Sequence, residues 1–343
     1  MKHPSCKASR LKVAFINRCP KDGHYSIESY FANVAKALRP YPIELKSCTS
    51  PYDSKSLIPR LRTMQFARLN QGDITHITGD IHFAALGLNH QRTVVTVHDC
   101  GRLHQTKSLR REVLRQFWFE LPLTRVGAVT VVSPEVKNDL LNWVPNLKPD
   151  KVHVVPVCIS PLYGFSAKPF NSSTPRILHI GSTPNKNLVR LIESMQGLKA
   201  TLVVVGKLDS RLKELLVTRN INYENHANLT SSQVVEVYRS IDILSFVSTF
   251  EGFGMPILEA QATGRPVLTS NCSSMPYVAG DSALLVDPFS VESIRAGLME
   301  LIRDSTLRDT LVARGSENIQ RFSADVIAKQ YLQIYDSLIS SPS

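Results

Sequence analysis

Two glutamates, Glu251 and Glu259, bracket the segment of this chain that is best suited to chemistry, EGFGMPILE. The residues before it, 241–247, have the pattern of a buried strand, and residues 256–262 have that of a helix with proline in its first turn. The first N–H groups of a helix lack partners and can bind an anion, while carboxylates accept hydrogen bonds from sugar hydroxyls. The segment therefore favours a ligand with both phosphates and sugar hydroxyls, which is a nucleotide-sugar.

The same segment resembles the E-x7-E signature of retaining glycosyltransferases with the two-Rossmann-domain GT-B fold. It is most similar to the bacterial glycosyltransferase family 4 group, which includes mannosyl- and glucosyltransferases that build lipid-linked glycans. The resemblance continues through residues 262–270 and 278–288. It is strong over most of residues 170–320 and looser in the N-terminal half.

The resemblance implies a role for each residue of the signature. Glu259 is expected to hold the donor ribose, and Glu251 to contact hydroxyls of the transferred sugar. Backbone N–H groups of the residues between them are expected to complete a phosphate cradle, namely Phe253, Gly254 and Met255. The family works without a bound metal or other cofactor, so none is expected here, and no D-x-D cluster argues otherwise.

The run GSTPNKN, residues 181–187, joins a predicted strand to a predicted helix and matches the family's donor loop. Lys186 is a suitable counter-charge for a diphosphate, and Asn187 is either a donor contact or the cap of the helix. Many relatives carry arginine where Ser182 follows Gly181. Lys207, after the next strand, is expected to supply the missing charge, with a solvated surface lysine as the alternative.

In the N-terminal half, the pair His98-Asp99 ends a predicted strand and matches a family motif that approaches the donor sugar. His98 is expected to donate a hydrogen bond to a sugar hydroxyl or to stabilise the departing diphosphate. The alternative is a His–Asp pair that only closes the strand–loop junction. The loop at residues 21–26 is expected to lie opposite, with N–H groups near Gly23 presented to donor or acceptor. The expected catalytic residues are thus His98, Lys186 and Glu251.

Strand and helix patterns alternate from end to end, which is typical of doubly wound parallel sheets. The length of 343 residues favours two domains. We predict an α/β chain of two Rossmann-like domains facing a cleft: 1–165 for the acceptor and 166–323 for the donor. A C-terminal helix at 324–343 is expected to cross back onto the first. The predicted strands are 11–17, 74–77, 93–97, 128–132, 151–155, 176–180, 201–205, 241–247, 266–268 and 283–286.

The net charge of +11 lies entirely in residues 1–165, because residues 166–343 carry equal numbers of acidic and basic side chains. This asymmetry indicates an anionic partner for the first half, such as a membrane surface or a phosphate-bearing acceptor. No nucleic-acid-binding motif is present. Residues 107–119 combine Lys107, Arg110, Arg111 and Arg115 with Leu109, Val113, Leu114, Phe117 and Trp118. They predict an amphipathic helix for an anionic membrane, or a plain surface helix.

The chain lacks both an apolar run of the roughly 18 residues that a membrane span needs and a signal-peptide pattern. Its six cysteines are scattered, as expected of reduced thiols. We therefore expect a cytoplasmic protein, with peripheral attachment to the inner face of the cytoplasmic membrane as a further expectation.

The expected activity is metal-independent, retaining transfer of a hexose from a nucleotide-diphosphate-sugar to a hydroxyl of a lipid-linked or surface-polysaccharide glycan. The alternatives are a non-catalytic nucleotide-sugar-binding partner subunit and another GT-B enzyme, such as a nucleotide-sugar epimerase. A phosphorylase would need a pyridoxal-binding lysine, and no sequence motif indicates one. A nicotinamide oxidoreductase is excluded because no G-x-G-x-x-G run follows any strand.

Overall fold

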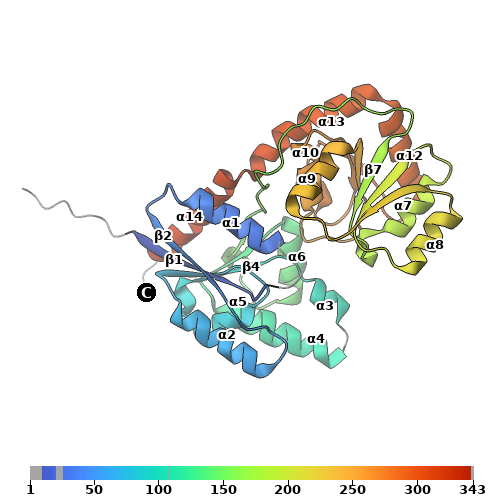
Figure 1. The fold of residues 1–343 in the computed structure, drawn as a ribbon. Coiled ribbons are helices and arrows are strands. Elements are labelled where there is room, and N and C mark those ends of the chain that lie inside the picture. Colours follow the sequence, from blue (N-terminus) through green and yellow to red (C-terminus); the bar gives the residue numbers. More distant parts are fainter. Residues whose placement is uncertain (1–9, 21–25, 107, 341–343) are drawn as a thin grey trace, which may run out of the picture. The chain divides into compact units, whose positions relative to one another are not determined.

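The computed structural model describes residues 10–20, 26–106 and 108–340 (Figure 1). Its contacts divide the chain into two compact units. The first unit comprises Met1–Val132, Val136–Cys158 and Ala324–Ser343, and the second comprises Ser133–Glu135 and Ile159–Ser323. Each unit is built around one six-stranded sheet in which all strands are parallel.

The sheet of the first unit has the strand order β2-β1-β3-β4-β5-β6. Its central strands are short runs of Val, Ile and Thr whose residues are buried on both faces, as parallel sheets require. The strands are β1 (Leu11–Asn17), β2 (Ile43–Thr49), β3 (Ile74–Ile77), β4 (Thr93–Val97), β5 (Ala128–Val131) and β6 (Val152–Val154).

The last helix of the chain, α14 (Ala324–Ser340), belongs to the first unit and packs against α1 (Ser26–Leu38) (Figure 1). Buried hydrogen bonds hold it there: the Tyr335 hydroxyl lies 2.7 Å from His76 Nδ1, and the Tyr331 hydroxyl lies 2.8 Å from that of Tyr30. The other helices of this unit are α2 (Leu57–Leu69), α3 (Gly101–Gln105), α4 (Ser108–Leu114), α5 (Leu121–Arg125) and α6 (Pro134–Trp143).

The sheet of the second unit has the order β12-β11-β10-β7-β8-β9. Its strands are β7 (Arg176–Ile180), β8 (Thr201–Val205), β9 (Asn222–His226), β10 (Ile243–Phe246), β11 (Val267–Ser270) and β12 (Leu284–Val286). Its helices are α7 (Leu188–Met195), α8 (Ser210–Thr218), α9 (Ser231–Ser240), α10 (Met255–Ala262), α11 (Met275–Ala279), α12 (Val291–Arg303) and α13 (Ser305–Asn318). One apolar cluster joins α7, α8 and α12 to a face of the sheet through residues such as Leu191, Leu216 and Leu298.

The strand order reverses between β1 and β3 in the first sheet and between β7 and β10 in the second. In doubly wound sheets, ligands bind outside the carboxyl ends of the strands at such a switch point. Arg18 follows β1, whereas the loop at 181–187 follows β7 and Glu251 follows β10. The topology therefore marks one candidate site on each unit.

The structure confirms the predicted fold class of doubly wound parallel sheets. The helix α2 and the outer strands β2 and β9 were not predicted from the sequence. The helix predicted over residues 107–119 is helical throughout its described part, but it is not one regular α-helix. Within the described residues, α4 ends at Leu114 and a π-helical turn, Arg115–Glu120, follows.

That turn divides the expected apolar face of residues 107–119. Trp118 is buried, whereas Leu109, Val113 and Phe117 are exposed. The extra residue of a π turn shifts the side chains that follow out of the helical register. Lys107 lies outside the described residues. None of the described helices is both long and apolar enough to cross a bilayer.

Candidate functional site

The loop after β7 places Lys186 beside Glu251. Lys186 Nζ lies 2.7 Å from Glu251 Oε1 and 4.9 Å from the centroid of the Phe246 ring. Gly181 makes room for this side chain, because it has a φ of 90° and a Cβ there would lie 2.9 Å from Lys186 Cγ. The residue expected to bind the diphosphate, Lys186, and the residue expected to bind the sugar, Glu251, therefore form an ion pair.

Glu251 is held by the loops on either side of it. Its backbone N–H donates to Ser273 Oγ, and its backbone carbonyl accepts from the hydroxyls of Ser273 and Ser274. The Asn185 amide donates to the Phe250 carbonyl at 3.1 Å. The backbone around Glu251 is therefore fixed, while its carboxylate stays at the surface of the unit, 15% exposed.

The helix α10 begins directly after Gly254, whose φ of 119° lets the chain turn from the strand into the helix. Pro256 fills the second helical position and brings no N–H. Within the described part of the chain, no group accepts a hydrogen bond from the backbone N–H of Phe253, Gly254 or Met255. Three adjacent donors at a helix N-terminus can bind an anion.

Glu259, in the second turn of α10, carries a partly buried carboxylate. Its Oε2 accepts a hydrogen bond of 2.6 Å from the Tyr238 hydroxyl, and the Tyr163 hydroxyl also contacts the carboxylate. Burial raises the pKa of Glu259, whereas Tyr238, Tyr163 and the nearby charge of Lys186 act in the opposite direction. This carboxylate is therefore not simply a solvated acid on a helix.

The other predicted donor contacts differ in their surroundings. Asn187 precedes α7 in the left-handed conformation, but its side chain does not cap the helix. Its amide instead donates to the carbonyls of Val247 and Pro288, so Asn187 shapes the loop from within. Ser182 is partly exposed, and Lys207 is exposed after β8 with no ion pair among the described residues. A Cβ on Gly206 would lie 3.4 Å from Gly181 Cα, so the two loops are adjacent.

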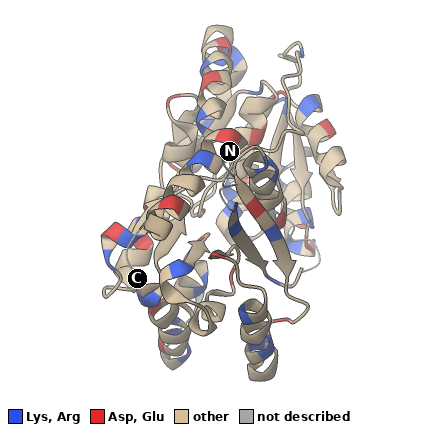
Figure 2. Cartoon of the chain, turned by 90° about the vertical axis from the view of Figure 1, so that its left-hand side faces the viewer, with Lys and Arg blue, Asp and Glu red and all other residues tan. Residues whose placement is uncertain are grey.

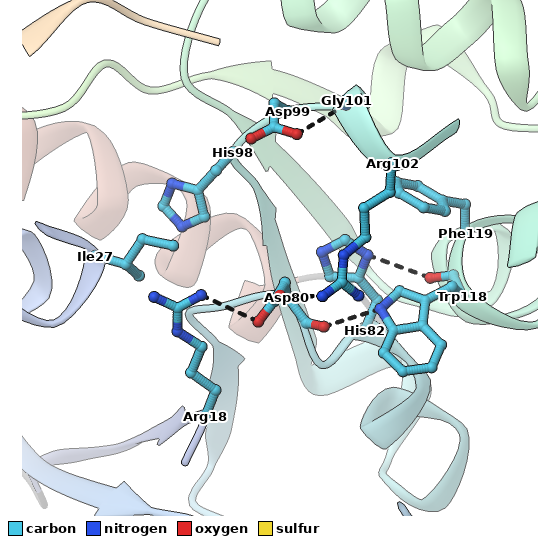
Figure 3. A pocket seen from close by; sticks show the side chains of 10 residues that line it. All are labelled: Arg18, Ile27, Asp80, His82, His98, Asp99, Gly101, Arg102, Trp118 and Phe119. Carbon is cyan, nitrogen blue, oxygen red and sulfur yellow. Dashed lines mark hydrogen bonds and ion pairs between the residues drawn. The ribbon is translucent and has the colours of Figure 1, made fainter. Parts of the chain in front are cut away.

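The first unit has a pocket of about 240 Å³ at its own switch point (Figure 3). It is lined by Arg18, Ile27, Asp80, His82, His98, Asp99, Gly101, Arg102, Trp118 and Phe119. The Asp80 carboxylate lies between two guanidinium groups, 3.3 Å from Arg18 and 3.2 Å from Arg102 (Figure 3). The Trp118 indole donates to the Asp80 carbonyl at 2.8 Å. Carboxylates, guanidinium groups and an aromatic ring are suited to bind a sugar.

His98 stands at the edge of this pocket with its ring edge-on to Tyr30 and Phe31. Its Nε2 lies 2.8 Å from the Thr78 carbonyl, which can only accept, so Nε2 carries the proton. Burial lowers the pKa of His98, and the ring is neutral near pH 7. In this tautomer Nδ1 can accept a hydrogen bond but cannot donate one. In this arrangement Nδ1 is the ring nitrogen left for a sugar hydroxyl, and it would receive the hydrogen bond.

Several pocket residues were not foreseen from the sequence: Arg18, Asp80, His82, Arg102 and Trp118. Arg18 and Asp80 could have been predicted from the topology, because they follow β1 and β3, the two strands between which the strand order reverses. Trp118 had been assigned to a surface helix. Gly23 lies outside the described residues. No cluster of three or more potential metal ligands occurs in the described parts of the chain.

Comparisons with known proteins match this architecture. The model of the family "Glycosyl transferases group 1" matches residues 165–318, and that of "Glycosyltransferase Family 4" matches residues 10–161. The MMP alpha-(1->4)-mannosyltransferase of Mycolicibacterium hassiacum is 24% identical over 342 residues, covering 87% of this chain and 80% of that protein.

The O-antigen chain mannosyltransferase B of Escherichia coli is 36% identical over 102 residues, which are 30% of this chain and 27% of that protein. Among solved structures, sucrose-phosphate synthase from Thermosynechococcus elongatus gives a TM-score of 0.79 at 17% identity. That match covers 97% of this chain and 100% of the other. The likeness establishes the GT-B fold.

Proposed function

Because the chain belongs to the glycosyltransferase family 4 group, we propose that it is a retaining hexosyltransferase with a nucleoside-diphosphate-sugar as its donor. The observation that carries this proposal is the arrangement after β7 and β10. There, Lys186 pairs with Glu251 at 2.7 Å beside a helix N-terminus with unpartnered N–H groups. A diphosphate supplies the negative charge that these groups favour, and the attached sugar supplies hydroxyls for the carboxylate.

The donor site would neutralise the leaving diphosphate with protein groups. Lys186 and Lys207 provide two positive charges, and the N–H groups of Gly254 and Met255 provide further donors at the start of α10. Such groups stabilise the charge that develops on the diphosphate as the glycosidic bond breaks. We propose that they make a metal ion unnecessary.

The acceptor would bind in the pocket of the first unit. His98 Nδ1 can accept a hydrogen bond from a sugar hydroxyl, and Asp80 and Arg102 offer further polar contacts. In the transfer, the acceptor oxygen bonds to the anomeric carbon while the bond from that carbon to the diphosphate oxygen breaks. The hydroxyl proton passes to a diphosphate oxygen, so both events take place on the same face of the sugar and the configuration is retained.

The acceptor class follows from the relatives. The similar Escherichia coli protein is named for O-antigen chains, and we propose a surface-polysaccharide or lipid-linked glycan acceptor here. An anionic membrane surface would suit such a lipid. The helix α2 exposes Leu57, Ile58, Leu61 and Leu69. It carries three arginines and no acidic residue; Figure 2 shows basic and acidic positions along the chain.

The exposed apolar residues of α4 extend this surface. Arg60 of α2 stacks 4.9 Å above the ring of Trp118, so α2 contacts the π-helical turn that follows α4. Basic side chains around exposed apolar ones are typical of proteins that bind an anionic bilayer surface. We propose a cytoplasmic protein that attaches peripherally to the inner face of the membrane.

The test is the release of nucleoside diphosphate from UDP-, GDP- and ADP-sugars, with and without glycan acceptors. Transfer predicts release that an acceptor accelerates, and the anomeric configuration of the product is then read by NMR. Binding without any release would favour the alternative of a silent partner subunit. Conversion of the donor sugar without transfer would favour an epimerase.

A further inference from the structure

We propose that Tyr238 is a positioning residue that holds the Glu259 carboxylate in the orientation that receives the ribose diol of the donor. The inference rests on the proposed function, because it assumes a nucleotide beside α10. Tyr238 lies on α9 and is fully buried. Its hydroxyl is 2.6 Å from Glu259 Oε2 and 3.4 Å from the Pro256 carbonyl. One short hydrogen bond from α9 thus fixes one oxygen of the Glu259 carboxylate.

Tyr238 is itself held rigidly. Arg265, which is 4% exposed, donates from Nε to the Tyr238 carbonyl at 3.0 Å and from Nη2 to the Arg239 carbonyl at 2.8 Å. A guanidinium group on the last carbonyls of a helix satisfies acceptors that have no helical partner and interacts favourably with the helix dipole. The Tyr163 ring packs edge-on against the Tyr238 ring, with centroids 5.5 Å apart. The hydroxyl of Tyr238 therefore has little freedom.

The contact has a chemical consequence as well as a geometric one. The groups that face the Glu259 carboxylate are Tyr238 from α9, Tyr163 from the segment before β7, and Lys186 from the loop after β7. All three favour the ionised carboxylate, against the burial that raises its pKa. An ionised carboxylate accepts from both hydroxyls of a diol, whereas a protonated one has lost acceptor capacity. Loss of the Tyr238 hydroxyl should therefore raise the pKa of Glu259 further and weaken binding of the diol.

Two variants and two ligands test this proposal. The nucleoside diphosphate is whichever of UDP, GDP and ADP binds most tightly in calorimetry, and its 2′,3′-dideoxy counterpart lacks the diol. Tyr238→Phe should weaken binding of the nucleoside diphosphate severalfold, because the Glu259 carboxylate loses its fixed orientation and is less readily ionised. It should leave binding of the dideoxy nucleotide nearly unchanged. The acidic limb of the binding–pH profile should move to higher pH. Glu259→Gln should remove that limb and reduce the preference for the ribose form.

Tyr163→Phe is the matched control, because it removes a hydroxyl at a partly exposed position and should shift the limb less. Thermal unfolding of each variant reports the structural effect separately. Equal losses for both ligands, or an unmoved acidic limb, would overturn the role of Tyr238. Wild-type protein that binds both ligands equally would overturn the role of Glu259 as well, while leaving the diphosphate site standing. Absence of binding to all three nucleotides would overturn the inference together with the donor proposal.

Discussion

Lys186 Nζ and Glu251 Oε1 lie 2.7 Å apart at the carboxyl ends of β7 and β10. Each was assigned to a different part of one donor molecule, Lys186 to the diphosphate and Glu251 to the sugar. A diphosphate that binds Lys186 must therefore compete with Glu251 or share the ammonium group with it. Glu251 neutralises the Lys186 ammonium group, and a bound diphosphate would replace one anionic partner of Lys186 by another.

This relationship predicts opposite effects for the two partners. Lys186→Ala should weaken nucleoside-diphosphate binding by about 1.5–3 kcal/mol, the usual contribution of a hydrogen bond to a charged group. Glu251→Gln should leave that affinity unchanged or increase it, because the ammonium group loses its competitor. Calorimetric titration of both variants measures the effect. Weaker nucleotide binding in Glu251→Gln would contradict the competition.

Lys207 is predicted to act as a second diphosphate cation, in place of the arginine that Ser182 replaces. Lys207→Ala should reduce nucleotide affinity and transfer together, since the charge serves the ground state and the transition state alike. Lys213→Ala is the matched control, because Lys213 is also exposed and lies on α8 of the same unit. The comparison is made from dissociation constants and kcat/KM values. Equal behaviour of the two variants would remove Lys207 from the site.

His98 is predicted to work as a neutral acceptor. Its pKa is lowered by burial, so protonation requires a pH below the ordinary value of 6.5, and transfer should therefore decline only below about pH 6.5. His98→Gln can still donate to the Thr78 carbonyl but loses the acceptor at Nδ1. With saturating donor, transfer should fall roughly fivefold, as expected for one lost hydrogen bond of about 1 kcal/mol, while nucleotide affinity is kept. If kcat already declines above pH 6.5 as the pH is lowered, the His98 ring is charged near neutral pH and the prediction is wrong.

The membrane surface is predicted to comprise α2 and α4 together. Each basic residue near an anionic bilayer contributes about 1 kcal/mol, screened by salt. Replacing Arg68, Arg110 and Arg111 by serine should abolish most binding to vesicles that contain anionic phospholipid. Arg115 is left unchanged, because it forms ion pairs with Glu112 and Glu120.

The control for the membrane prediction removes the same charge elsewhere. Arg211, Lys213 and Arg303 are exposed on the second unit, and their replacement by serine should leave vesicle binding intact. Co-sedimentation at low and high salt measures both variants. Equal losses in the two would show a general charge effect rather than a docking surface.

The sequence predicted the buried strands well, because runs such as Thr93–Val97 contain only β-branched residues. It failed at the outer strands β2 and β9, whose polar side chains alternate weakly and face solvent. The helix α2 has no apolar stripe, since several of its leucines are exposed. Neither the outer strands nor α2 can therefore be predicted from the local pattern of apolar residues.

The donor loops could be predicted because their residues are contiguous in short motifs. The pocket of the first unit could not, since it combines ends of separate strands with a π-helical turn. That turn is held by contacts that no local pattern reveals: the Trp118 indole on the Asp80 carbonyl, and the Trp118 carbonyl near His82 Nδ1. The contact between Tyr238 and Glu259 likewise joins two helices that the sequence treats separately.

The central claim is that one donor molecule binds along the second sheet, its ribose at Glu259 and its sugar at Glu251. The most direct measurement is calorimetric titration of wild type, Glu251→Ala and Glu259→Ala with a nucleoside diphosphate and with the matching nucleotide-sugar. Glu259→Ala should weaken both ligands. Glu251→Ala should keep the affinity for the nucleoside diphosphate. It should lose only the additional affinity that the sugar gives to the nucleotide-sugar. Equal effects of the two substitutions on the nucleoside diphosphate would contradict this division of the site.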